Sequence, residues 1–405
     1  MKIFWNEFKK LLDWKVLLIL SLFTVFFYFS AVKPFLIPYS HPETETYELG
    51  KRIAEKYGSS LDAQEQKEFE NVDFPAIRQA ANREIAKIPA FRHAKITTVD
   101  QFDELDEKDG KASDKLFSAV DATIPAGPDH PDDFYLYWEA HNTVLQMIDN
   151  VRHPVNKRIV SASEGAARER AGVLENRITS NGIPIIPYTL PDEWNMFFCS
   201  FSVLTMITAA VLVSPYLIRE YRSGIRGLTY TCRKGRPLFC IQFLAALSAA
   251  ALVEAVQFAV FLLVIFSDPY LNFRQFFRCD FSCCWWLWWD MSFGQYIALN
   301  CAVLFLLSLG FAIVSFVVSK FCKNYVTVLA AQVPLVYLMN SLNQSVVGGM
   351  FNLFRPLQYQ PVTGGPFSIF RPPYFEPLIC ALCTLLPLSL CLFLVYREKR
   401  KDILS

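Results

Sequence analysis

The segment Ser214-Pro-Tyr-Leu-Ile-Arg-Glu-Tyr-Arg-Ser-Gly-Ile-Arg-Gly-Leu-Thr-Tyr-Thr-Cys-Arg-Lys-Gly-Arg-Pro237 joins two long apolar runs. It carries six arginine and lysine residues but only one acidic residue, Glu220. Short basic loops between apolar runs are typical of the cytoplasmic side of polytopic membrane proteins, because the excess of lysine and arginine sets their orientation. The segment therefore predicts a membrane fold and gives a first marker of how it lies in the membrane.

Apolar residues occur in blocks along the rest of the chain. They make up 53% of its 405 residues. A helix of about 20 apolar residues crosses roughly 30 Å of hydrocarbon at a rise of 1.5 Å per residue. The predicted spans are Val16–Val32, Trp194–Ile218, Leu238–Phe266, Phe293–Ser319, Tyr325–Leu342 and Phe375–Tyr396. The sequence thus predicts an all-α polytopic membrane protein with six transmembrane helices, the fifth of which is interrupted by Pro334.

The net charge of +1 conceals a strong segregation of charge. Residues 33–193 hold 19 basic and 28 acidic residues, a net charge of −9, and the remaining 20 basic and 10 acidic residues leave +10. If the six spans alternate, 16 of those 20 basic residues lie on one side of the membrane. The positive-inside rule then predicts that both termini are cytoplasmic and that the chain is a multi-pass protein of the cell membrane.

This topology divides the chain into five parts. Residues 1–15 form a predicted amphipathic helix on the cytoplasmic surface, because Phe4, Phe8 and Leu11 recur at helical spacing. No small-residue cleavage site follows the first apolar run, so we expect a retained anchor. The other parts are the first span (16–32), a mainly helical extracellular domain (33–193), a five-helix membrane region (194–396) that contains the loop 214–237, and a basic cytoplasmic tail (397–405).

The extracellular segments contain several predicted features. Helical patterns and charged runs predict helices near residues 47–56, 63–69, 77–88, 132–149 and 160–177. Four tryptophans lie at positions 285, 286, 288 and 289, and they fit either an aromatic belt at the outer interface or a platform that stacks a ligand. Cys279, Cys283 and Cys284 lie nearby in the sequence. Either one disulfide forms among them or with a partner, or the three thiols are free.

No catalytic motif stands out in the chain. It lacks the Gly-x4-Gly-Lys-Ser/Thr phosphate loop, His-Glu-x-x-His and Gly-x-Ser-x-Gly, which removes the commonest ATPase, metalloprotease and esterase interpretations. All five histidines lie in residues 33–193. His130 with Asp132 and Asp133, or Glu139 with His141, are conceivable metal ligands, but their spacing matches no known site. We therefore expect no catalytic site, no metal site and no nucleic-acid partner.

Glu254 is an acid near the middle of the third predicted span, and Gln257 lies one turn further on. A charged group at this depth costs about 2.5–3.5 kcal/mol on insertion scales, so both side chains should face protein or a water-filled path. Two interpretations stay open. The residues belong to a translocation path or a subunit interface, or Glu254 is a protonated acid bonded to a neighbour such as Asn300 or Gln332.

The basic loop itself has helical spacing. Ile218, Tyr221, Ile225 and Leu228 repeat at three and four residues, which predicts a short amphipathic helix. The alternative is a basic loop that serves only orientation and contact with anionic lipid. The order Glu220, Gly224, Leu228-Thr-Tyr-Thr231 and Gly235-Arg236 resembles the loop after the second span in type-2 ATP-binding cassette (ABC) exporter permeases. Gln242 departs from that pattern, because a basic residue often opens the third span there.

The resemblance also extends to the N-terminal helix, the six spans and the large insertion after the first span. It implies a permease subunit that pairs with a second permease copy or a paralogue and with separately encoded ABC ATPase subunits. ATP and Mg would then bind the ATPase, and this chain would hold no cofactor. By position, the residues that would couple to the ATPase are Glu220, Arg222, Gly224, Arg226, Gly235 and Arg236.

Two other classes of protein stay open. One is a membrane sensor or receptor whose extracellular domain binds a peptide or an envelope component. The other is a membrane enzyme that acts on lipids or peptides, although no nucleophile or metal cluster supports it. Nothing in the sequence ranks peptides, drugs and lipids as the transported substrate.

Overall fold

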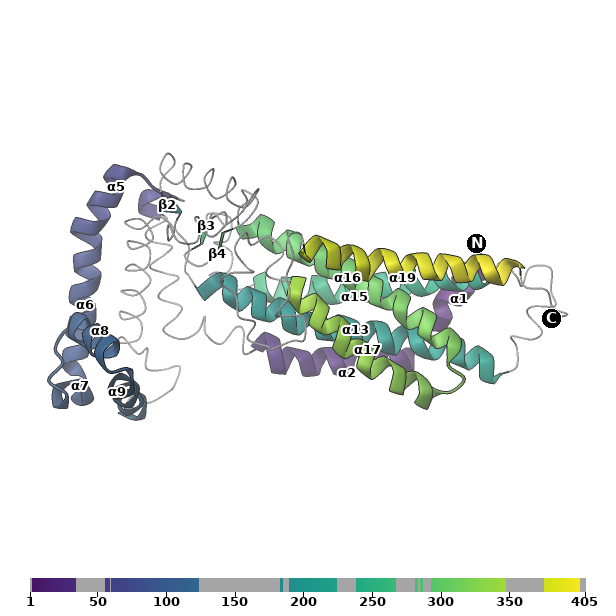
Figure 1. Cartoon of the computed structure of the whole chain (residues 1–405), viewed down its shortest axis with the longest axis horizontal. Coiled ribbons are helices and arrows are strands. Elements are labelled where there is room, and N and C mark those ends of the chain that lie inside the picture. Colours follow the sequence, from purple (N-terminus) through teal and green to yellow (C-terminus); the bar gives the residue numbers. More distant parts are fainter. Residues whose placement is uncertain are drawn as a thin grey trace.

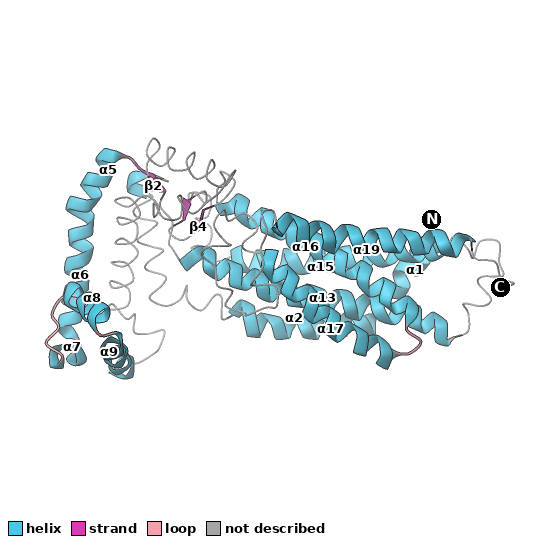
Figure 2. Cartoon of the chain, in the orientation of Figure 1, coloured by secondary structure: helices cyan, strands magenta, loops and turns pink. Residues whose placement is uncertain are grey.

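The described part of the chain consists of helices with two pairs of very short strands (Figures 1 and 2). The computed structural model describes residues 2–33, 55–58, 60–123, 183–184, 189–223, 238–266, 281–282, 285–286, 293–346 and 375–400. The helices of the membrane region and the helix before it are α1 (Lys2–Leu11), α2 (Trp14–Phe27), α13 (Thr189–Arg222), α15 (Leu238–Phe266), α16 (Phe293–Phe321), α17 (Tyr325–Val346) and α19 (Phe375–Arg400). The helices within residues 33–193 that precede α13 are α5 (Ala63–Glu68), α6 (Phe74–Lys87), α7 (Pro89–His93), α8 (Val99–Lys108) and α9 (Gly110–Thr123).

Two π-helical turns and four strands complete the elements of the described ranges. The turn η1 (Tyr28–Val32) extends α2, and η3 (Phe69–Asp73) joins α5 to α6. Strand β1 (Ser60–Leu61) pairs antiparallel with β2 (Ile183–Pro184), and β3 (Phe281–Ser282) pairs antiparallel with β4 (Trp285–Trp286). Each strand has only two residues. The first pair joins two distant parts of residues 33–193, and the second pair includes Trp285 and Trp286.

Among the residues that the structure describes, five helices are long and apolar enough to cross a membrane, which indicates a multi-pass membrane protein. They cover Trp14–Val32, Phe197–Arg222, Leu238–Phe266, Gly294–Phe321 and Leu378–Glu398. The predicted fifth span corresponds to α17, which contains Pro334 and has only the shorter apolar stretch Tyr325–Ser341. Although α17 packs beside α13, α16 and α19, it is not among the five, and the described residues therefore do not establish the count of six.

The bundle is built around α13 and α16. In their most apolar windows, 67% and 61% of the residues are buried, against 22% in α2. Aromatic side chains fill the space between α2, α13 and α15: the Phe27 ring lies 5.7 Å from Phe201 and 5.3 Å from Phe261. The peripheral helices expose large apolar side chains such as Leu22 and Leu385, as expected where lipid replaces water.

One contact between helices depends on a glycine. A Cβ atom added to Gly310 of α16 would lie 2.3 Å from the carbonyl oxygen of Cys383 in α19. No other residue leaves the two backbones this close, because any side chain would overlap the carbonyl group. Gly310 therefore fixes the close approach of α16 to α19, which lie side by side in Figure 1.

The helices α6–α9 form a small packed unit at the end of the molecule far from α1 (Figure 1). Its core contains Ile85, Phe91, Val99, Phe102 and Val120, all buried. The predicted helices near 63–69 and 77–88 correspond to α5 and α6. The predicted helices near 132–149 and 160–177, most of the one near 47–56, and Cys279, Cys283 and Cys284 lie outside the described residues.

Candidate functional site

The predicted basic loop 214–237 does not begin at Ser214, because a helix continues past that residue. Helix α13 continues through Pro215 to Arg222, so residues 214–222 are the last turns of a helix. Proline removes one backbone hydrogen bond, which membrane helices tolerate where neighbouring groups satisfy the freed carbonyl. Glu220 and Arg222 therefore lie on the end of α13, and Ile218 and Tyr221 belong to α13 and not to a separate amphipathic helix.

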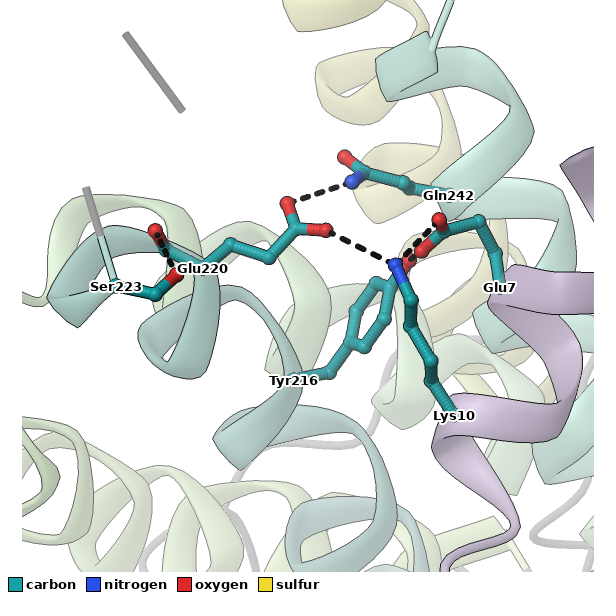
Figure 3. Close-up of polar contacts among 6 residues, drawn as sticks. All are labelled: Glu7, Lys10, Tyr216, Glu220, Ser223 and Gln242. Carbon is teal, nitrogen blue, oxygen red and sulfur yellow. Dashed lines mark hydrogen bonds and ion pairs between the residues drawn. The ribbon is translucent and has the colours of Figure 1, made fainter. Parts of the chain in front are cut away.

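Glu220 joins three helices at this end of the bundle (Figure 3). Its carboxylate accepts a hydrogen bond of 2.6 Å from the side-chain amide of Gln242 in α15, and it lies 3.9 Å from the ammonium group of Lys10 in α1. The Glu220 side chain is only 20% exposed, so these two donors replace much of its hydration. Gln242, the departure from the permease pattern, is the residue that connects Glu220 to α15.

A second acid supports the same arrangement from α1. Glu7 is buried, forms an ion pair of 2.6 Å with Lys10, and accepts a hydrogen bond from the hydroxyl group of Tyr216 in α13 (Figure 3). A buried carboxylate needs such partners, because removing one leaves an uncompensated charge. Lys10 thus lies between Glu7 and Glu220, and α1 is held against the end of α13.

Further polar contacts lie at the same end. Arg219 of α13 forms an ion pair of 3.1 Å with Asp13, whose carboxylate also caps the N-terminus of α2. The Arg222 guanidinium lies 5.5 Å from the ring centroid of Tyr325 at the start of α17. The ends of α13, α16 and α19 and the starts of α1, α15 and α17 lie together at the end of the bundle opposite α5–α9 (Figure 1).

A cleft opens within this polar region. It has a volume of about 420 Å³. It is lined by Lys9, Lys10, Asp13, Trp14, Tyr216, Arg219 and Glu220. These are carboxylates, cations, a phenol and an indole, so the chemistry available among them is ion pairing and hydrogen bonding. No group of three or more metal-ligating side chains occurs among the residues that the structure describes.

Glu254 lies inside the bundle and is fully buried. Its Oε2 atom lies 2.5 Å from the hydroxyl oxygen of Ser308 in α16, and that hydroxyl also lies 2.8 Å from the carbonyl oxygen of Phe305. A serine hydroxyl has one proton to donate. Both contacts are satisfied together when Glu254 carries a proton of its own, which also avoids the cost of a buried charge. The partner is thus Ser308 and not Asn300 or Gln332.

Gln257 connects three helices one turn further along α15. Its amide nitrogen donates to the hydroxyl oxygens of Thr24 in α2 and Thr208 in α13, both at 3.0 Å. Both Gln257 and Glu254 are thus buried inside the helix bundle. Their place in a translocation path or at a subunit interface stays a prediction.

Of the residues predicted to couple to an ATPase, only some lie in the described part of the chain. Glu220 and Arg222 lie at the end of α13, whereas Gly224, Arg226, Gly235 and Arg236 lie outside the described residues. The sequence reasoning missed Glu7, Lys10 and Tyr216 as members of the cluster. One signal for Glu7 was present, because it lies three residues after Phe4 and four before Leu11, on the apolar side of α1.

Comparison of the chain with protein-family models, with curated proteins and with solved structures finds no match.

Proposed function

We propose that the chain is the permease subunit of an ABC exporter. In this proposal α17 is the fifth of six spans, both termini and the segment 214–237 are cytoplasmic, and residues 33–193 are extracellular. The chain pairs with a second permease copy or a paralogue to form the translocation path, and separately encoded ATPase subunits supply the energy of ATP hydrolysis. Support comes from the loop pattern that begins at Glu220 and from the five apolar helices.

One observation carries the proposal. Glu220 is joined to Lys10 and Gln242, directly before the segment 224–237 that would meet the ATPase. A displacement of that segment by a partner would therefore act on α13, α1 and α15 together. Packed helices joined by ion pairs and hydrogen bonds move as one body more readily than they deform separately. A coupling element for an ATP-driven transporter requires this property.

The hydrogen bonds of the buried residues Glu254 and Gln257 are of a kind that can exchange when helices repack. Glu254 and Gln257 hold α15 to α16, α2 and α13 through hydrogen bonds. Such bonds inside membrane bundles contribute about 0.6 kcal/mol on average, which is weak enough to exchange during a rearrangement. We infer that Glu254 and Gln257 line the path when the bundle opens.

The experiment is affinity purification of the full chain from membranes of its own host, followed by identification of the associated proteins. We expect an ABC ATPase to co-purify and Glu220→Ala or Arg226→Glu to lower both its recovery and its coupled turnover. Glu104→Ala and Arg83→Glu are matched controls, because they make the same charge changes on exposed parts of α8 and α6. The proposal fails if the wild type recovers no ATPase, or if both the Glu220→Ala and the Arg226→Glu variants recover as much ATPase as the controls.

A wild-type preparation without any ATPase would favour the sensor class instead. The packed unit α6–α9 would then be the part to test for binding of a peptide or an envelope component.

A further inference from the structure

The lining of the cleft between α1, α2 and α13 carries three cations and two carboxylates. They are the cations of Lys9, Lys10 and Arg219 and the carboxylates of Asp13 and Glu220. Arg219 pairs with Asp13, and Lys10 pairs with the buried Glu7 behind the lining and lies 3.9 Å from Glu220. Lys9 is therefore the cation of the lining that no lining carboxylate balances.

Lys9 forms no ion pair within the part of the chain that the structure describes. Its ammonium group lies 5.7 Å from the centroid of the Trp5 ring, and Lys15, which follows the cleft residue Trp14, has a similar place 5.9 Å from the Trp14 ring. Both lysines are exposed. An anion that entered the cleft would therefore meet Lys9 without first breaking an ion pair among the described residues.

The edge of the cleft has the composition of a membrane interface. Trp14 is 68% exposed and Trp5 is 53% exposed, although both are large apolar side chains. Tryptophan prefers the headgroup level of a bilayer, because its ring is amphipathic. The cleft lies where helix α1 meets the first apolar helix, and its lining combines the exposed Trp14 indole with the cations of Lys9, Lys10 and Arg219.

We propose that this cleft binds the phosphodiester headgroup of an anionic phospholipid from the adjacent leaflet. Lys9 would pair with the phosphate, Lys10 and Arg219 would supply further donors from the lining, and the Trp14 ring would cover the glycerol region. A volume of about 420 Å³ lies within the usual range for small-ligand sites, roughly 300–1,000 Å³. The acyl chains would follow the exposed apolar face of α2, on which Leu18 and Leu22 lie.

This site is independent of the proposed transport function, because it needs neither an ATPase nor a substrate. Bound lipid would fix the angle between α1 and α2. Since Lys10 and Asp13 take part in both the cleft and the contacts with α13, the lipid would stabilise the same junction that Glu220 joins to α15.

The test is a lipid titration of the full-length purified protein, followed by native mass spectrometry. The wild type, Lys9→Gln and Lys2→Gln are each titrated with phosphatidylglycerol and, separately, with phosphatidylcholine. Lys2→Gln is the matched control, because it removes the same charge from the same helix but lies outside the cleft lining. A third titration with inorganic phosphate distinguishes a lipid headgroup from free phosphate.

We expect one phosphatidylglycerol to bind the wild type and Lys2→Gln alike. Lys9→Gln should bind it roughly five-fold more weakly, the effect of losing one basic residue near an anionic headgroup. Phosphatidylcholine should show no difference among the three proteins. Equal weakening by Lys2→Gln would mean general surface attraction and would overturn the site. Displacement of the lipid by inorganic phosphate at comparable concentration would overturn the lipid as its ligand.

Discussion

Replacing Gly310 with alanine should force α16 and α19 apart. The added Cβ would lie 2.3 Å from the carbonyl oxygen of Cys383, 3.1 Å from its carbonyl carbon and 3.4 Å from the Cα atom of Thr384. All three atoms belong to the backbone, so no change of rotamer relieves the overlap. A separation of at least 3.0 Å from the oxygen requires a local shift of 0.7 Å between two packed helices.

The expected loss follows from two opposing effects. Overpacking a closely packed interior costs about 1–3 kcal/mol. Alanine is a better helix former than glycine by roughly 1 kcal/mol, and this gain offsets part of the overpacking cost. The net expectation for Gly310→Ala is a loss of about 1–2 kcal/mol in the free energy of unfolding. Gly310→Leu should lose more, because its side chain has no space at the same contact.

The assay is reversible unfolding of the purified protein in mixed micelles by increasing denaturing detergent, followed by circular dichroism. Leu306→Ala in the same helix is the control for a change on an exposed face, since Leu306 is 57% exposed. Adding Cys383→Ala to Gly310→Ala should restore nothing, because the contacting atoms are backbone atoms. An equal or higher unfolding midpoint for Gly310→Ala would refute the close contact between α16 and α19.

Three further predictions concern other parts of the molecule. Glu254→Gln should change the unfolding free energy by less than ~1 kcal/mol in the same assay, because a neutral amide of similar size keeps a hydrogen bond with Ser308. Glu398→Gln should cost about 3–5 kcal/mol by leaving the buried Lys320 without its 2.5 Å ion pair, and a joint Lys320→Met and Glu398→Leu variant should recover much of that loss. Lys95→Gly should slow amide exchange in α7 by stabilising it by about 1 kcal/mol, because residue 95 has a φ of 60° after the end of that helix.

The apolar pattern located the membrane helices well but not all their ends. The run predicted for residues 194–218 lies within the longer helix α13, which begins at Thr189 and continues to Arg222. The run predicted for 325–342 forms α17, but its apolar stretch Tyr325–Ser341 is shorter than the five helices that meet the requirement for a span. Helix ends depend on whether neighbours satisfy the freed backbone groups, which a local pattern does not record.

The candidate site was predicted only in part for a similar reason. Glu220 stood out as the single acid of a basic segment, whereas its partners Lys10 and Gln242 lie far away in the sequence. Tyr216 and Glu7 are 209 positions apart, and only the packing of α1 on α13 brings them together. The spacing of residues along one helix indicates which face they share but gives no information about what faces them.

The sequence alone determined the apolar helices, because hydrophobicity over about 20 residues is a local sum that the bilayer thickness selects. It also determined the segregation of charge between residues 33–193 and the rest of the chain. Only the tertiary structure decided that Glu254 bonds to Ser308, that Gly310 touches the Cys383 carbonyl group, and that a cleft opens beside Lys9. These contacts act over a few ångströms between distant segments, so they exist only once the helices have packed.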